Sequence, residues 1–90
     1  MSEERKYWVK GAWRFNLESS VDKLNVIIID ARAGEVQFPL TVAGTTCHTV
    51  GDVYDLLDEV ENLAWIAQSR KVTGREYGRI KSIVEWRVNA

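Results

Sequence analysis

The most reactive side chains in this sequence are Cys47 and His48, the single cysteine and the single histidine of the chain. A cysteine nucleophile needs a base within hydrogen-bond distance, and that base normally comes from a distant part of the sequence. Neighbouring residues of an extended loop point in opposite directions. We therefore expect a structural role for both residues and no catalytic pair.

Other spacings that support catalysis or cofactor binding are missing from the sequence. One cysteine cannot form an internal disulfide, and one histidine with one cysteine excludes most metal sites built on these ligands. The glycines at 44, 51, 74 and 78 match neither a phosphate-binding loop nor a dinucleotide fingerprint. The sequence thus predicts a protein that is not an enzyme and that holds no metal or cofactor.

Acidic and aromatic residues alternate at helical spacing between residues 54 and 65. The candidate partner-binding residues are Tyr54, Asp55, Asp58, Glu59, Glu61 and Trp65. Tyrosine and tryptophan are favoured anchors of protein interfaces, and the carboxylates suit a basic surface. Two plainer interpretations stay open: a solvated helix face, or a Trp65 covered by the connection 70–78.

A second set of residues combines basic side chains with an aromatic ring, as single-strand nucleic-acid binders do. It comprises Trp8, Lys10, Arg14, Arg79, Lys81 and Arg87, expected on the outer face of a sheet. Glu85 interrupts this set, and the pI of about 5.8 is far below the basic range typical of nucleic-acid modules. Alternating charge is also ordinary on a solvated sheet.

The segment 49–68 has the strongest helical pattern of the chain. Its apolar residues step by three and four, at Val53, Leu57, Val60, Ala64 and Ala67, and Leu56 and Leu63 widen the stripe. Thr49 is a good N-cap, and Asp52 stands where a capping box places an acidic side chain. We expect this helix to lie on a sheet.

Four other segments show patterns typical of strands. Residues 7–17, 35–42 and 79–88 alternate in polarity, and 24–31 contains the β-branched run Val26 to Ile29. Gly34 suits a tight hairpin between the second and third strands. Pro39 favours an edge position for the third strand. Residues 43–48 and 70–78 are predicted loops.

These elements predict one α+β domain over residues 1–90, with a polar tail at 1–6. Its single four-stranded, mostly antiparallel sheet would carry one helix on one face, in the order β-β-β-α-β and the strand order 3-2-1-4. Placement of the last strand beside the third, or its exchange between two chains, satisfies the same pattern. The expected core is Val9, Trp13, Phe15, Val26, Ile28, Val36, Phe38, Leu40, Leu57, Val60, Ala64, Val84 and Trp86.

Charge is unevenly distributed along the chain. Residues 18–69 have a net charge of −7, whereas residues 1–17 and 70–90 have +2 and +4. No apolar run is long enough to span a bilayer and no signal-peptide core is present, so we expect a cytoplasmic protein without membrane contact.

The expected function is therefore that of a small non-catalytic protein-binding module. We expect an inhibitor or regulatory accessory protein, of the kind found among antitoxins and phage-encoded inhibitors, which docks its acidic helix face on a larger protein with a basic surface. Direct nucleic-acid binding through the basic sheet is the alternative. A homodimer is also expected, since an edge strand and the rings of Trp8 or Trp65 would gain from a second copy.

Overall fold

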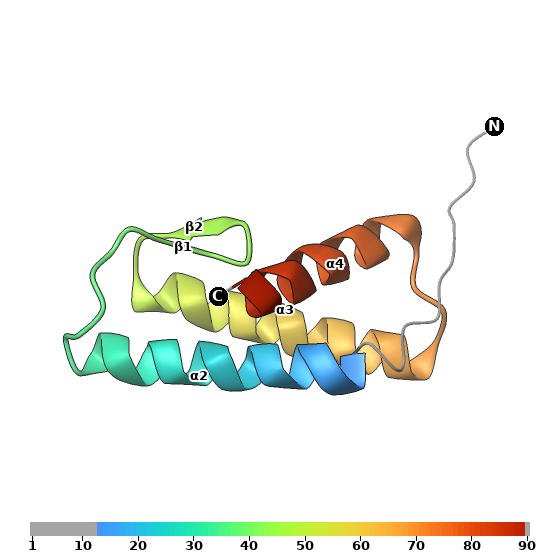
Figure 1. Ribbon diagram of the computed structural model, residues 1–90, viewed down its shortest axis with the longest axis horizontal. Coiled ribbons are helices and arrows are strands. Elements are labelled where there is room, and N and C mark those ends of the chain that lie inside the picture. The colour runs from blue at the N-terminus through green and yellow to red at the C-terminus, as the bar shows by residue number, and fades with distance from the viewer. Residues whose placement is uncertain (1–12, 90) are drawn as a thin grey trace.

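Three α-helices and one short antiparallel hairpin make up the described part of the chain (Figure 1). The computed structural model describes residues 13–89, apart from the side chains of residues 15, 16 and 87–89. The elements are a π-helical turn η1 (Trp13–Leu17), α2 (Glu18–Arg32), β1 (Leu40–Val42), β2 (Thr45–Cys47), α3 (Val50–Ser69) and α4 (Gly74–Asn89). The predicted four-stranded sheet with one helix is therefore wrong.

Helix α2 replaces the predicted strand 24–31. The buried residues of α2 are Ser20, Leu24 and Ile28, which follow one another at helical intervals. Leu17, just before the helix, is also buried. In a helix the β-branched run from Val26 to Ile29 spreads around the axis, and these two end residues are 55% and 65% exposed. Tertiary packing on α3 outweighs the weak strand propensity of that run.

A glycine C-cap ends α2. Gly34 has φ +81°, and its N–H donates to the carbonyl of Ala31 at 3.1 Å while the Glu35 N–H donates to that of Asp30 at 2.8 Å. This pair of bonds is the Schellman motif. The positive φ predicted at Gly34 is confirmed, but it terminates a helix and not a hairpin.

The hairpin lies later in the chain than predicted. Leu40 pairs with Cys47, and Val42 with Thr45, around a two-residue turn in which Ala43 and Gly44 have φ of 52° and 80°. Two consecutive positive φ values match the twist of the flanking strands. The predicted strand 35–42 is therefore reduced to its last three residues, and the predicted loop 43–48 contains the turn and β2.

The predicted helix is confirmed as α3, including its cap. Thr49 Oγ1 accepts the Asp52 N–H at 3.3 Å, and Asp52 Oδ2 accepts the N–H groups of Thr49 at 3.3 Å and His48 at 2.7 Å. The fully buried stripe is rotated slightly from the predicted one. It consists of Val53, Leu56, Val60, Leu63 and Ala67, while Leu57 and Ala64 are half-buried.

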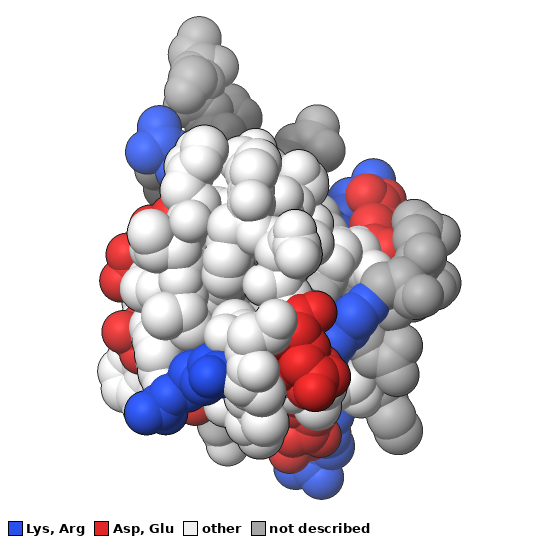
Figure 2. All heavy atoms as spheres, turned by 90° about the vertical axis from the view of Figure 1, so that its left-hand side faces the viewer, with Lys and Arg blue, Asp and Glu red and all other residues white. Residues whose placement is uncertain are grey.

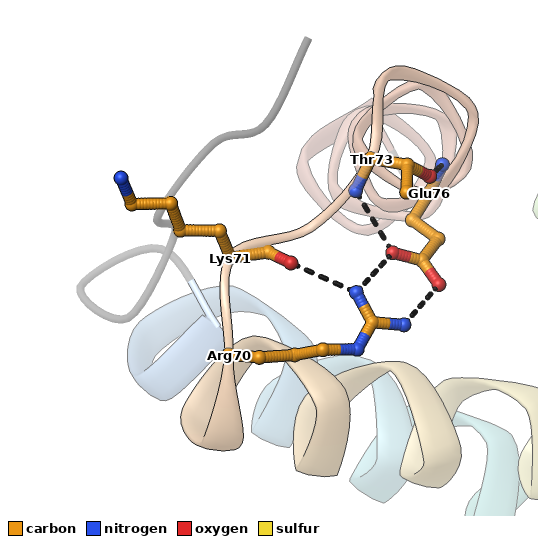
Figure 3. A network of polar contacts seen from close by, with 4 residues as sticks. All are labelled: Arg70, Lys71, Thr73 and Glu76. Atoms are coloured by element: carbon orange, nitrogen blue, oxygen red, sulfur yellow. Dashed lines mark hydrogen bonds and ion pairs between the residues drawn. The ribbon is translucent and has the colours of Figure 1, made fainter. Parts of the chain in front are cut away.

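Helix α4 replaces the predicted strand 79–88. A second capping box starts it, in which Thr73 Oγ1 accepts the Glu76 N–H at 3.2 Å and Glu76 Oε1 accepts the Thr73 N–H at 2.9 Å. The Arg70 guanidinium donates two hydrogen bonds to the same Glu76 carboxylate (Figure 3). Among residues 74–86 of α4, the buried side chains are those of Ile80 and Ile83, three residues apart.

Helices α2 and α3 run antiparallel side by side, and α4 folds back over them at one end while the hairpin occupies the other (Figure 1). All these elements contribute to one core. Its members are Leu17, Leu24, Ile28, Val42, Ala43, Cys47, Val53, Leu56, Val60, Leu63, Ala67, Val72, Ile80 and Ile83.

Only some residues of the predicted core are buried in the structure. Ile28 and Val60 are fully buried, and Trp13, Val36, Phe38, Leu40, Leu57, Ala64, Val84 and Trp86 are half-buried. Val26 is exposed, because in a helix it faces away from α3. Val9 and the side chain of Phe15 lie outside the described residues. Of the predicted strand 7–17, residues 13–17 form η1 instead.

Candidate functional site

The acidic and aromatic residues predicted on α3 lie largely on its solvent side. Tyr54, Asp55, Asp58, Glu61 and Trp65 are exposed, and Glu59 is half-buried. The side chain of Trp65 is 63% exposed. The chain that follows α3 therefore does not cover this ring, which excludes one of the plainer interpretations of its position.

A hollow of about 400 Å³ lies beside Trp65, between α2 and α3. It is lined by Glu18, Val21, Asp22, Glu61, Ala64, Trp65 and Gln68. The lining thus combines three carboxylates with two small apolar side chains and the ring of a tryptophan. A lysine or arginine side chain of a partner matches this lining. Its charged group pairs with the carboxylates, and its methylene chain or its cation packs on the indole ring.

The residues that α2 gives to this hollow were not predicted. Residues 18–23 look like a polar turn when the next segment is interpreted as a strand. The available signal was the spacing of Glu18, Val21 and Asp22, which places them on one side of a helix. We define the acidic-aromatic face as Glu18, Asp22, Tyr54, Asp58, Glu61 and Trp65.

Tyr54 marks the other end of the acidic-aromatic face. Its hydroxyl accepts a hydrogen bond from Nη1 of Arg32, the last residue of α2, at 3.1 Å. The contact fixes the ring beside the C-terminus of α2. Tyr54 therefore offers an aromatic surface at the far end of the α2–α3 pair from Trp65.

Glu59 serves a structural role. Its carboxylate accepts from Nε and Nη2 of Arg79 at 2.7 and 3.0 Å, and Arg79 also donates to the Ala43 carbonyl at 2.7 Å and to Thr45 Oγ1 at 3.1 Å. This cluster joins α3, α4 and the hairpin. We therefore leave Glu59 and Arg79 out of the surfaces available to a partner.

The basic residues predicted on a sheet face are not brought together on one. Trp8, Lys10 and the side chain of Arg87 lie outside the described residues. Arg14 is exposed on η1 and Lys81 is exposed on α4, while Arg79 is held by Glu59. Within residues 13–89 the sheet has two strands of three residues each, too small to carry the predicted surface.

Cys47 and His48 face different environments. Cys47 is fully buried in β2, and burial together with the nearby Asp52 carboxylate raises the pKa of its thiol. His48 is exposed. A buried thiol with a raised pKa is a poor nucleophile, because the thiolate is the reactive form.

A second hollow of about 400 Å³ lies between the hairpin and the start of α3. Its lining is Thr45, Thr46, His48, Asp52, Asp55, Leu56 and Glu59. Two of its carboxylates are already engaged, Asp52 in the helix cap and Glu59 with Arg79. Among residues 13–89, no group of three or more metal-ligating side chains has the geometry to hold a metal ion.

The hairpin end of the molecule contrasts with the helices in its charge. Residues 36–51 contain no Asp, Glu, Lys or Arg, although these residues make up 28% of the chain. The view onto this end is mostly uncharged, with acidic and basic side chains around its margin (Figure 2). Most charged side chains of the described residues therefore lie on the helices.

No protein-family model matches this chain, and neither the curated proteins nor the solved structures contain a significant match. None of the helices within residues 13–89 combines the length and apolar character needed to cross a membrane.

Proposed function

We propose that this protein is a non-catalytic protein-binding module that docks its acidic-aromatic face on a basic surface of a larger protein, as an inhibitor or regulatory accessory protein. One observation carries the proposal. Trp65 is 63% exposed and lines a hollow together with Glu18, Asp22 and Glu61.

An exposed tryptophan beside a hollow is suited to binding. Burying an indole ring in an interface removes a large apolar area from water, and such rings are enriched among the residues that dominate binding energy. A lysine or arginine of the partner would insert beside it and gain both cation–π attraction and a carboxylate partner.

Electrostatics favour a basic partner over an acidic one. The helices α2 and α3 belong to the segment 18–69, whose net charge is −7. Among the described residues, Asp22, Asp58 and Glu61 form no ion pair, so their charges are free to act on a partner. Complementary charge raises the association rate and selects the partner, and both effects weaken with salt.

The test is a pull-down from native host extract with three versions of the protein. Wild type should retain a partner with a basic surface, which mass spectrometry identifies. Asp58→Arg combined with Glu61→Arg should lose it, and Trp65→Ala should weaken it by about tenfold or more, as expected of an anchor residue. The purified partner is then titrated with each variant at low and high salt.

A matched control reverses two charges elsewhere. Arg75→Glu combined with Lys81→Glu changes exposed residues of α4 and should leave the partner bound. Arg79 is unsuitable for this control because it holds Glu59. If the α3 pair keeps the partner, while the α4 pair loses a partner that nuclease treatment releases, the proposal is wrong and direct nucleic-acid binding takes its place.

A further inference from the structure

The solvent side of α2 has an apolar centre between two opposite charges. Val26 and Ile29 are neighbours one helical turn apart and are 55% and 65% exposed. Asp22 lies one turn before Val26 and Arg32 lies one turn after Ile29, and both are exposed. The partly buried flank of α2 toward α4 includes Lys23, whose Nζ lies 4.5 Å from the centroid of the Trp86 ring.

We propose that α2 pairs with α2 of a second copy of this chain, antiparallel and around a two-fold axis that passes between Val26 and Ile29. In such a two-fold interface both copies use the same patch. Val26 of each copy therefore contacts Ile29 of the other. This inference goes beyond the proposed docking function and does not depend on it.

Charge complementarity identifies a second copy as the occupant. With Val26 opposite Ile29 of the second copy, the antiparallel register places Asp22 beside Arg32 of that copy, and the two-fold axis repeats this pair at the other end. A uniformly basic or acidic partner would meet a like charge at one end of the same stripe. Nη1 of Arg32 donates to the Tyr54 hydroxyl of the same copy at 3.1 Å, and the other N–H groups of the guanidinium stay available to Asp22 of the second copy.

The size of the patch sets the expected strength. One exposed helix side per copy gives an interface at the low end of the range, below ~1,200 Å², where association is weak and reversible. The dimer should therefore appear as a concentration-dependent equilibrium. It leaves Trp65 and Asp58 on α3 outside the contact, whereas Asp22 is shared between the dimer contact and the hollow beside Trp65.

The experiment is sedimentation equilibrium of the purified protein over a concentration series. Wild type should shift from the 10.3 kDa monomer toward twice that mass as its concentration rises. Val26→Ser combined with Ile29→Ser should remain monomeric. Because all the altered residues are exposed, circular dichroism melts should show that each variant folds as wild type does.

Charge reversal then tests the register. Asp22→Arg alone should weaken the dimer by about tenfold or more, because it faces Arg32 of the second copy, and Asp22→Arg combined with Arg32→Asp should restore it. The control Asp58→Arg makes the same reversal on α3 and should change nothing. A wild type that stays monomeric at every concentration, or a double reversal no better than the single one, overturns the proposal.

Discussion

Arg79 donates two hydrogen bonds to the carboxylate of Glu59, from Nε to Oε2 at 2.7 Å and from Nη2 to Oε1 at 3.0 Å. The same guanidinium also donates a hydrogen bond to the carbonyl of Ala43 in the hairpin turn, a residue with a positive φ. The planar guanidinium binds a carboxylate through two parallel hydrogen bonds and reaches further acceptors with its other N–H groups, a geometry that the compact ammonium of lysine does not provide. One side chain thus fixes α4 and the hairpin to α3.

Replacing Arg79 by lysine should lower the free energy of unfolding by about 1–3 kcal/mol, as expected for loss of charged, partly buried hydrogen bonds. Urea denaturation measures the difference. Lys81→Met on the exposed side of the same helix is the control and should stay within about 0.5 kcal/mol of wild type. Equal effects of the two substitutions would show that the Arg79 cluster contributes no stability.

The capping box of α4 should make stability depend on pH. Hydrogen bonds from Arg70 and from the Thr73 N–H lower the pKa of Glu76 to about 2 (Figure 3). A carboxyl with a lowered pKa in the folded state stabilises the fold above its unfolded pKa of about 4.3 and loses that contribution as the pH falls toward about 2.

We therefore expect Glu76→Gln to be less stable than wild type by about 1 kcal/mol above pH 5. The difference should shrink steadily between about pH 5 and pH 2, as the carboxyl becomes protonated first in the unfolded and then in the folded state. Chemical denaturation at a series of pH values measures it. A difference that stays constant down to pH 2 would contradict the assigned role of the Glu76 charge.

Two glycines should respond to alanine with opposite signs. Gly34 has φ +81° at the end of α2, so Gly34→Ala should destabilise the protein by about 1–2 kcal/mol, although no atom lies within 4 Å of the added Cβ. Gly78 is inside α4 with equally open space, so Gly78→Ala should stabilise by up to about 1 kcal/mol. Thermal unfolding of the two variants tests both, and a stabilised Gly34→Ala would rule out the Schellman cap.

The position of the buried stripe on α3 predicts which of two neighbouring leucines contributes more to the free energy of unfolding. Leu56 is 4% exposed and Leu57 is half-buried. Leu56→Ala should cost about 2–5 kcal/mol through lost burial and the cavity left behind, and Leu57→Ala clearly less. Urea titrations rank them, and the reverse order would mean that the helix is rotated toward the predicted stripe.

The exposed positions of the acidic-aromatic face on α3 could be predicted because α3 is specified locally. Its stripe is long, and the Thr49–Asp52 capping box lies within the same segment, so a local pattern was sufficient. The hollow beside Trp65 could not be predicted in the same way. It needs Glu18 and Asp22 from α2, whose helical state depends on contacts with α3.

The sequence by itself determined α3, its cap and the positive φ at Gly34, because each depends on neighbours a few residues away. Tertiary structure decided α2 and α4. The β-branched run Val26 to Ile29 and the alternation after Arg79 both favour strands locally, and the Thr73–Glu76 capping box was the one local signal for α4. Burial of Leu24, Ile28, Ile80 and Ile83 in a core shared with α3 outweighs that preference, since helix stability in proteins comes mainly from packing an apolar face.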